Sequence, residues 1–169
     1  NLMKLENYMF KRCYKPKRFG KVKEFWIHHF SDASEEGYGQ VSFLRMKNHK
    51  GKIHCCFVMG KARVTPKKFV SIPRLELTAA TLSVKVSTFI KKELKIDNIK
   101  ETFWSDSKVV LGYIRNNSKK FKVFVANRIQ QIQEGSKVEQ WKYVPTKLNP
   151  AVYAYKGFEP TVFNRKKAI

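Results

Sequence analysis

The sequence predicts an α/β protein in which helices cover a mixed β-sheet. Three observations predict this class: three strand-like runs come first in the chain, a long helical segment follows them, and shorter strands and helices then alternate. The chain has 169 residues, of which 43% are hydrophobic. That length and composition are enough for one domain with a buried core.

The first half of the chain reads as three strands joined by turns. Residues 24–32 alternate polar and apolar side chains, and 40–47 and 52–64 are similarly strand-like. Glu35–Gly39 is expected to form the first turn, and Asn48–Gly51 is expected to close a hairpin onto the third strand.

A long helix is predicted next. After the proline-bounded connection from Thr65 to Pro73, apolar residues follow a helical period until about Leu94. Pro73 would lie in the first turn, where its missing N–H costs nothing. The remaining elements are predicted as a strand at 99–105, helices at 108–114 and 121–133, a strand at 139–144, a loop at 145–150, and a final short helix or frayed tail.

The two ends of the chain differ in composition from the middle. Residues 1–23 are rich in Lys and Arg and are predicted to be a basic arm or linker, and residues 159–169 a basic C-terminal tail, which leaves 24–158 as the folded domain. The first residue is Asn rather than Met, which indicates a piece of a longer protein.

Charge favours nucleic acid as the partner. The net charge is +22 and the pI is about 10.1, so the protein attracts phosphate backbones regardless of their sequence. The alternatives are lysines that serve only solubility, and an anionic membrane surface, for which no basic amphipathic helix stands out. Without an apolar run of about 20 residues or a signal peptide, a soluble intracellular protein is expected, its compartment left open between cytoplasm and nucleus.

The number and spacing of the cysteines and histidines indicate neither a disulfide framework nor a zinc site. Cys13, Cys55 and Cys56 are an odd number with two adjacent, which suits reduced core thiols. His28, His29 and His54 lie in no pattern with zinc-ligand spacing.

Three carboxylates are the best candidates for chemistry. Asp32, Glu76 and Asp106 end the first strand, begin the long helix and end the fourth strand, so they could converge at one edge of the sheet. Singly, they could be a turn residue, a first-turn glutamate and a helix N-cap, respectively. Together, such carboxylates suit Mg²⁺ or Mn²⁺, and paired ions of this kind hydrolyse phosphodiesters.

The chain resembles the ribonuclease H domain of Pao/BEL-type retrotransposon polyproteins over nearly its whole length. The motifs that carry the resemblance are His29–Gly39, Lys61–Pro66, Ile72–Leu77, Trp104–Leu111, Phe124–Arg128 and Asn149–Ala151. The resemblance implies a ribonuclease H-like fold, a five-stranded mixed sheet whose first three strands are antiparallel, flanked by helices. It also implies cleavage of the RNA strand of RNA/DNA hybrids by a metal-dependent endonuclease, with a reverse transcriptase domain adjoining. Carried over by motif, Asp32, Glu76 and Asp106 would be catalytic and metal-binding.

The fourth carboxylate of the family is missing. The family pattern continues Asn-Pro-Ala with Asp, and this chain has Val152 there, with Tyr155 and Lys156 in place of the family's Ser and Arg. Valine cannot ligate a metal, so we expect one ion rather than two and weak nuclease activity or none. The alternative is a non-catalytic nucleic-acid-binding module from a decayed element. An aspartic peptidase is not expected, because Asp-Thr-Gly and Asp-Ser-Gly are both absent.

Contacts to the nucleic acid are predicted around the helix at 121–133. The candidates are Lys119, Lys120, Lys122, Asn127 and Arg128. A solvated lysine loop is the alternative. Trp26, Trp104 and Trp141 are expected to be core residues rather than base-stacking platforms.

Overall fold

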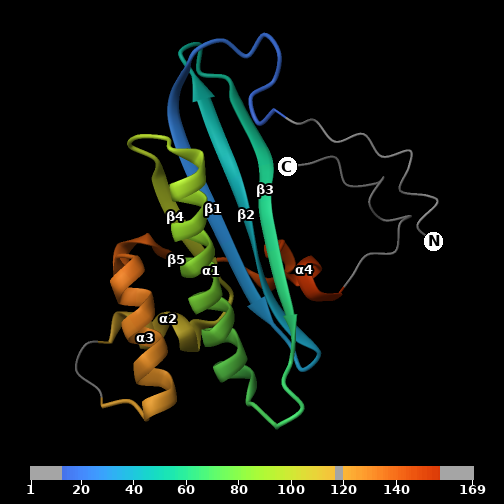
Figure 1. Cartoon of the computed structure of the whole chain (residues 1–169), viewed down its shortest axis with the longest axis vertical. Coiled ribbons are helices and arrows are strands. Elements are labelled where there is room, and N and C mark those ends of the chain that lie inside the picture. Colours follow the sequence, from blue (N-terminus) through green and yellow to red (C-terminus); the bar gives the residue numbers. More distant parts are fainter. Residues whose placement is uncertain (1–12, 117–119, 157–169) are drawn as a thin grey trace, which may run out of the picture.

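A single five-stranded sheet organises the protein. The computed structural model describes residues 13–116 and 120–156. The strands lie in the order β3-β2-β1-β4-β5 (Figure 1). Their bounds are β1 Val22–Ala33, β2 Gly37–Asn48, β3 Ile53–Val64, β4 Lys100–Ser105 and β5 Trp141–Tyr143. The first three strands pair antiparallel, and β4 and β5 are added in parallel. The predicted mixed sheet is confirmed.

The helices follow the predicted order. They are α1 Ile72–Leu94, α2 Lys108–Arg115, α3 Val123–Gly135 and α4 Val152–Lys156, with 3-10 turns at Val138–Gln140 and Thr146–Leu148. Pro73 lies at the start of α1, as predicted, because a proline there removes no helical hydrogen bond. Lys95 ends α1 in the left-handed conformation and donates its N–H to the carbonyl of Lys91.

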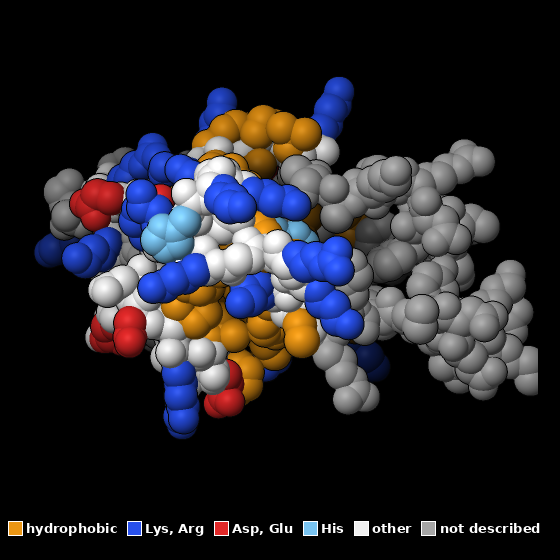
Figure 2. Space-filling view, turned by 90° about the horizontal axis from the view of Figure 1, so that it is seen from above, with side chains coloured by type: hydrophobic (Ala, Val, Ile, Leu, Met, Phe, Trp, Pro, Cys, Tyr) orange, Lys and Arg blue, Asp and Glu red, His pale blue; other side chains and the backbone are white. Residues whose placement is uncertain are grey.

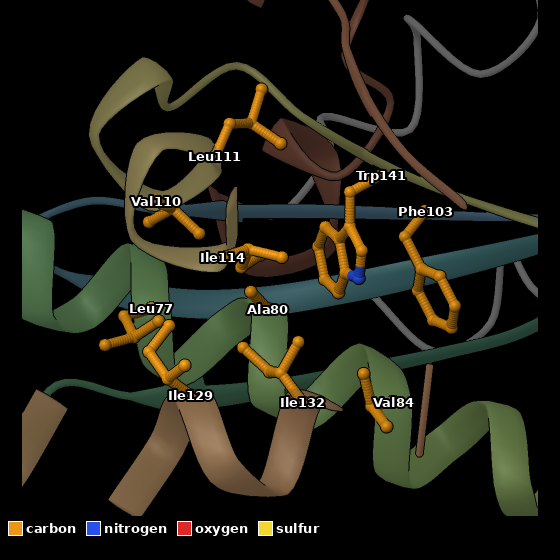
Figure 3. Close-up of a cluster of buried hydrophobic side chains, with 10 residues drawn as sticks. All are labelled: Leu77, Ala80, Val84, Phe103, Val110, Leu111, Ile114, Ile129, Ile132 and Trp141. Carbon is orange, nitrogen blue, oxygen red and sulfur yellow. The ribbon is translucent and has the colours of Figure 1, made fainter. Parts of the chain in front are cut away.

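α1 covers one face of the sheet (Figure 1). Its residues Leu75, Ala79 and Val86 pack with Ile27 and Ala33 of β1. A second cluster joins α1 to α2, α3 and the last two strands (Figure 3), and its members are Leu77, Ala80, Val84, Phe103, Val110, Leu111, Ile114, Ile129, Ile132 and Trp141. Burial of these side chains is the main force that holds the helices to the sheet.

α4 packs on the opposite face. Side chains alternate along β2, so residues such as Gly39 face away from α1. The Cβ of Ala154 lies 3.0 Å from where a Cβ of Gly39 would be, and Tyr155 comes similarly close to Gly37. These two glycines therefore allow α4 to approach the sheet closely.

Two boundaries differ from those predicted. The first turn covers residues 34–36, not Glu35–Gly39, because Gly37 already pairs with Val64 of β3. β1 begins at Val22, and Phe19 is buried against Leu44 and Met46, so residues in the segment expected to be an arm contribute to packing.

Several expectations about single side chains were only partly right. Trp141 is a core residue, but Trp26 and Trp104 lie half-buried on the face away from α1, where Trp104 stacks on Phe30. The three cysteines are free thiols, as predicted, but Cys13 is exposed and the other two are half-buried. They are therefore not core thiols.

Candidate active site and nucleic-acid interface

Asp32 lies within β1 and not in a turn. Its register partner in β2 is Gly39, and the residue is only 7% exposed. The hydroxyl of Tyr155 in α4 donates a hydrogen bond of 2.7 Å to Oδ2 of Asp32. The close packing of α4 on the sheet thus places an aromatic hydroxyl directly on this carboxylate.

Glu76 lies beyond the first turn of α1, so it is not the dipole-complementing residue considered from the sequence. Burial raises the pKa of its carboxyl group, and the nearby Asp106 and Asp32 raise it further. Ser107 opposes this shift by donating a hydrogen bond of 2.6 Å to Oε2 of Glu76. The carboxyl is therefore partly buried and lies within electrostatic range of both aspartates.

Asp106 follows β4 directly and precedes α2. The N-cap of α2 is Ser107, whose Oγ accepts from the N–H of Val110 at 3.2 Å. The capping role considered for Asp106 is therefore taken by its neighbour, which leaves the Asp106 carboxylate available for another role.

The sheet brings Asp32 and Asp106 together. β1 and β4 are adjacent parallel strands in which Ser31 pairs with Ser105, so the two aspartates follow matched positions at the carboxyl ends of the central strands. Neighbouring strands lie about 4.8 Å apart. With Glu76 in electrostatic range, all three predicted carboxylates converge at one edge of the sheet.

The donor set fits a hard cation in its chemistry. Carboxylate oxygens are the ligands that Mg²⁺ and Mn²⁺ prefer. In the described part of the chain, no three Asp, Glu, His or Cys side chains lie close enough together to hold a metal ion as they stand. Val152, which the resemblance puts in place of a fourth carboxylate, supplies no ligand atom.

The start of α4 is anchored beside Asp32. The Asn149 amide donates to the carbonyl of Ser31 at 3.0 Å and accepts from the N–H of Ala151 at 3.1 Å. The roles of Asn149 and Tyr155 were missed from the sequence. Asn149 lies in a recognised motif, which was a usable signal, whereas nothing local predicted the partner of Tyr155.

The structure puts the predicted nucleic-acid contacts in different places. Lys119 lies outside the described residues. Lys120 and Lys122 are exposed before α3, whereas Asn127 and Arg128 line a cleft with Thr78 of α1. The structure therefore brings only the last pair together with another element.

A buried polar pair was also missed. The Nε2 of His29 lies 3.1 Å from Oε1 of Glu101, beneath α1. Burial lowers the pKa of His29, while hydrogen bonds from His29 and Ser87 outweigh burial and lower the pKa of Glu101 to about 2. His28 and His29 face opposite sides of the sheet, because successive strand residues alternate. They cannot share a metal ion.

Comparisons with known proteins agree on the fold. The model of the Pao retrotransposon-like RNaseH-like domain family matches residues 1–107. No curated protein matches the chain. LC11-RNase H1, solved with an RNA/DNA hybrid, is 10% identical with a TM-score of 0.51, covering 83% of this chain and 99% of its own. This similarity shows the ribonuclease H fold.

Two further ribonuclease H structures are similar. RNase H1 of Halobacterium salinarum is 11% identical with a TM-score of 0.46, covering 76% of this chain and 91% of its own. The N-terminal RNase H domain of a Mycobacterium tuberculosis protein is 12% identical with a TM-score of 0.46, covering 80% and 90%. Within the described residues, no helix is both long and apolar enough to cross a bilayer.

Proposed function

The chain belongs to the family of Pao retrotransposon-like RNaseH-like domains, and on that premise we propose that it binds RNA/DNA hybrids and cleaves their RNA strand weakly or not at all. The observation that carries the proposal is the register of β1 and β4, which sets Asp32 beside Asp106 with Glu76 in electrostatic range. A hybrid is bound by the structural relative LC11-RNase H1.

The three carboxylates are the proposed catalytic groups. Asp32, Glu76 and Asp106 would hold one Mg²⁺ or Mn²⁺ ion, which supplies activation of a water molecule and charge stabilisation at the phosphodiester. The residues of this chain would position that chemistry. Ser107 holds the Glu76 carboxyl by its hydrogen bond, and the parallel register of β1 and β4 fixes the spacing of the aspartates.

Two features of α4 support impaired cleavage. Val152 removes the fourth carboxylate, and loss of even an outer partner of a metal costs about 10–100-fold in affinity or activity. Tyr155 hydrogen-bonds Asp32, so an incoming cation competes with a protein donor for that oxygen.

Binding itself is supported by the charge of the molecule. The net charge is +22, and Lys and Arg side chains are spread over the end that carries the β2–β3 turn (Figure 2). Cationic surfaces gain affinity from counterion release, which depends on salt and little on sequence. An A-like hybrid is recognised by its shape and 2′-hydroxyls, so we expect slight sequence preference.

The second candidate is a non-catalytic nucleic-acid-binding module. The contact of Tyr155 with Asp32 favours it, because a domain freed from catalysis can keep its fold while its carboxylates take up protein partners. In either case we expect the domain to work beside a reverse transcriptase domain of a retroelement polyprotein. Its folded core would be 24–158, extended at the start by Phe19 and Val22, which pack with the sheet.

Binding and cleavage are tested together on one labelled RNA/DNA hybrid. Affinity is measured by fluorescence anisotropy at two salt concentrations, against a DNA duplex of the same sequence. Cleavage is followed in Mg²⁺ and in Mn²⁺. We expect salt-sensitive binding, and any cleavage should disappear in Asp32→Asn while affinity stays nearly unchanged. Cleavage that persists in Asp32→Asn would remove Asp32 from the mechanism, and failure to bind the hybrid would overturn the proposal.

A further inference from the structure

The sheet carries a row of aromatic rings on the face away from α1. Trp104 of β4 lies nearly parallel to Phe30 of β1, with their ring centres 5.9 Å apart. Phe30 meets Phe43 of β2 edge to face at 6.0 Å, and Phe43 meets Phe57 of β3 in the same way at 6.0 Å. The row therefore crosses β4, β1, β2 and β3, which are neighbours in the sheet.

The rings of this row lie outside the buried core. Among the described residues, none of the four belongs to a cluster of buried hydrophobic side chains. Phe57 is 56% exposed, and the other three are half-buried. α4 approaches this face at Gly37 and Gly39, where β2 begins. Apolar side chains that lie side by side in contact with water mark a binding surface.

Positive charge borders the row. Lys142 of β5 is the register partner of Trp104 and is exposed. Arg45 follows Phe43 by two residues on β2, so it points to the same side of the sheet. Its guanidinium lies 4.4 Å from the centre of the Trp26 ring. Within residues 13–116 and 120–156, neither cation forms an ion pair, so both are available to phosphate groups.

The two carboxylates that β1 contributes to this face are already engaged. Oε2 of Glu24 lies 3.3 Å from Nζ of Lys100, and its Oε1 lies 3.9 Å from Nζ of Lys47. Asp32 accepts the hydrogen bond of Tyr155. The face around the rings therefore has a positive charge and attracts an anionic chain.

We infer that this face of the sheet binds single-stranded nucleic acid, with bases stacked on the row of rings and backbone phosphates on the cations beside it. Every base has a π-face, so aromatic side chains accept successive bases of a single strand regardless of sequence. Rings on the open face of a sheet bind single-stranded RNA in this way. A duplex keeps its bases stacked inside and cannot use the rings. An acidic protein surface also suits this charge, but it offers no bases to stack on them. The site lies beyond the proposed function, which concerns hybrids at the carboxylates.

The first measurement uses the tryptophans of the unchanged chain. Of the three in the sequence, Trp26 and Trp104 lie on this face, whereas Trp141 is buried at 2% exposure. Oligo(dT) is titrated against an abasic strand of the same length, which carries the same phosphates without bases. Because a stacked base quenches indole fluorescence, we expect oligo(dT) to quench the signal and the abasic strand to leave it nearly unchanged.

The second measurement removes single contacts. Phe57→Ala deletes the most exposed ring of the row, and Phe89→Ala on α1, 51% exposed, is the matched control. A ring that stacks on a base contributes about 5- to 150-fold in affinity, so Phe57→Ala should bind oligo(dT) at least about fivefold more weakly. Lys142→Gln should reduce the slope of log affinity against log salt by about 0.7, the value for one phosphate of a single strand. Lys92→Gln, also exposed on α1, should change the slope much less.

The affinity for an RNA/DNA hybrid, measured on the same proteins, separates this inference from the proposed function. Weaker binding of oligo(dT) by Phe57→Ala with unchanged hybrid affinity supports a second site. Equal oligo(dT) affinity in Phe57→Ala and Phe89→Ala, or equal quenching by oligo(dT) and the abasic strand, overturns the inference and leaves the proposed function standing. If oligo(dT) quenches the unchanged chain but the hybrid does not bind, only the proposed function fails; if neither binds, both are overturned.

Discussion

The hydroxyl of Tyr155 donates a 2.7 Å hydrogen bond to Oδ2 of Asp32, which joins the last helix to the central strand β1. Burial raises the pKa of the Tyr155 phenol, and the charge of Asp32 raises it further. The hydroxyl therefore keeps its proton at neutral pH and remains a donor. The carboxylate on which metal binding would depend is thus already engaged by the protein.

Replacing Tyr155 with Phe should strengthen metal binding. The variant loses the donor to Asp32 but keeps the ring that packs beside Gly37. Hydrogen bonds to charged groups contribute about 1.5–3 kcal/mol, and each 1.4 kcal/mol is a factor of ten, so we expect the dissociation constant for Mn²⁺ to fall by about 10- to 140-fold. Electron paramagnetic resonance of free Mn²⁺ measures this constant directly.

Tyr153→Phe is the matched control, because Tyr153 lies on the same helix. Its Mn²⁺ affinity should equal that of the unchanged protein. If Tyr155→Phe also leaves the affinity unchanged, the hydrogen bond to Asp32 does not compete with the ion.

Gly39→Ala should destabilise the fold. A Cβ at this position would lie 3.0 Å from the Cβ of Ala154 and 3.1 Å from the carbonyl oxygen of Lys61, so α4 or β3 must shift. Such overpacking costs about 1–3 kcal/mol of the free energy of unfolding. Urea denaturation measures the loss.

Gly112→Ala should instead stabilise the fold in the same urea assay. Gly112 lies inside α2, and apart from its chain neighbours and the backbone of α2 itself no atom lies within 4 Å of the added methyl group, so the variant should gain about 0.5–1 kcal/mol in the free energy of unfolding. If both substitutions changed the free energy of unfolding equally, the close approach of α4 to β2 would not restrict the size of the side chain at position 39.

Stability should fall as pH drops from about 6.5 to 4, in part because of His28. Burial and, to a smaller extent, the nearby charge of Arg45 together lower the pKa of His28 to about 4. The indole of Trp104 donates to Nδ1 of His28 at 3.2 Å, which requires the unprotonated nitrogen. In this pH range the unfolded chain binds a proton at His28 that the folded chain does not. The contribution of neutral His28 to the free energy of unfolding is therefore complete above pH 6.5 and lost toward pH 4.

His28→Gln should reduce this pH dependence by up to one proton, because glutamine keeps an acceptor for Trp104 and does not titrate. The free energy of unfolding is measured by urea at several pH values between 4 and 7. His49→Gln, an exposed change next to the β2–β3 turn, is the control. The same slope in all three proteins would mean that His28 takes up its proton without cost to the fold.

Much of the fold could be predicted because its signals are local. Alternation along 24–32 and the helical period after Pro73 gave strands and helices close to β1 and α1. The ends were less accurate, because pairing with β3 extends β2 back to Gly37, which no local pattern indicates. The N-cap considered for α2 was Asp106, whereas the structure has Ser107 in that role, and the sequence does not separate adjacent Asp and Ser because both residue types cap helices.

The convergence of the site needed more than local signals. Asp32 and Asp106 meet through the register of Ser31 with Ser105, a pairing of distant segments. The places of the two residues at the ends of predicted strands suggested this grouping and the family resemblance supported it, but the register that brings them together cannot be read from either strand alone. Neither local pattern nor resemblance gave the contacts of Tyr155 with Asp32 or of His29 with Glu101, because each joins residues far apart in the chain.

The most direct test compares Val152→Asp with the unchanged chain on one labelled RNA/DNA hybrid, with Val152→Asn as the uncharged control. Affinity and the rate of RNA-strand cleavage in Mn²⁺ are measured side by side. We predict that all three proteins bind the hybrid about equally, and that Val152→Asp cuts its RNA strand at least about 10–100-fold faster than the other two. If the unchanged chain cleaved the RNA strand as fast as Val152→Asp, the account would be contradicted, because the missing carboxylate would then not limit the rate of cleavage.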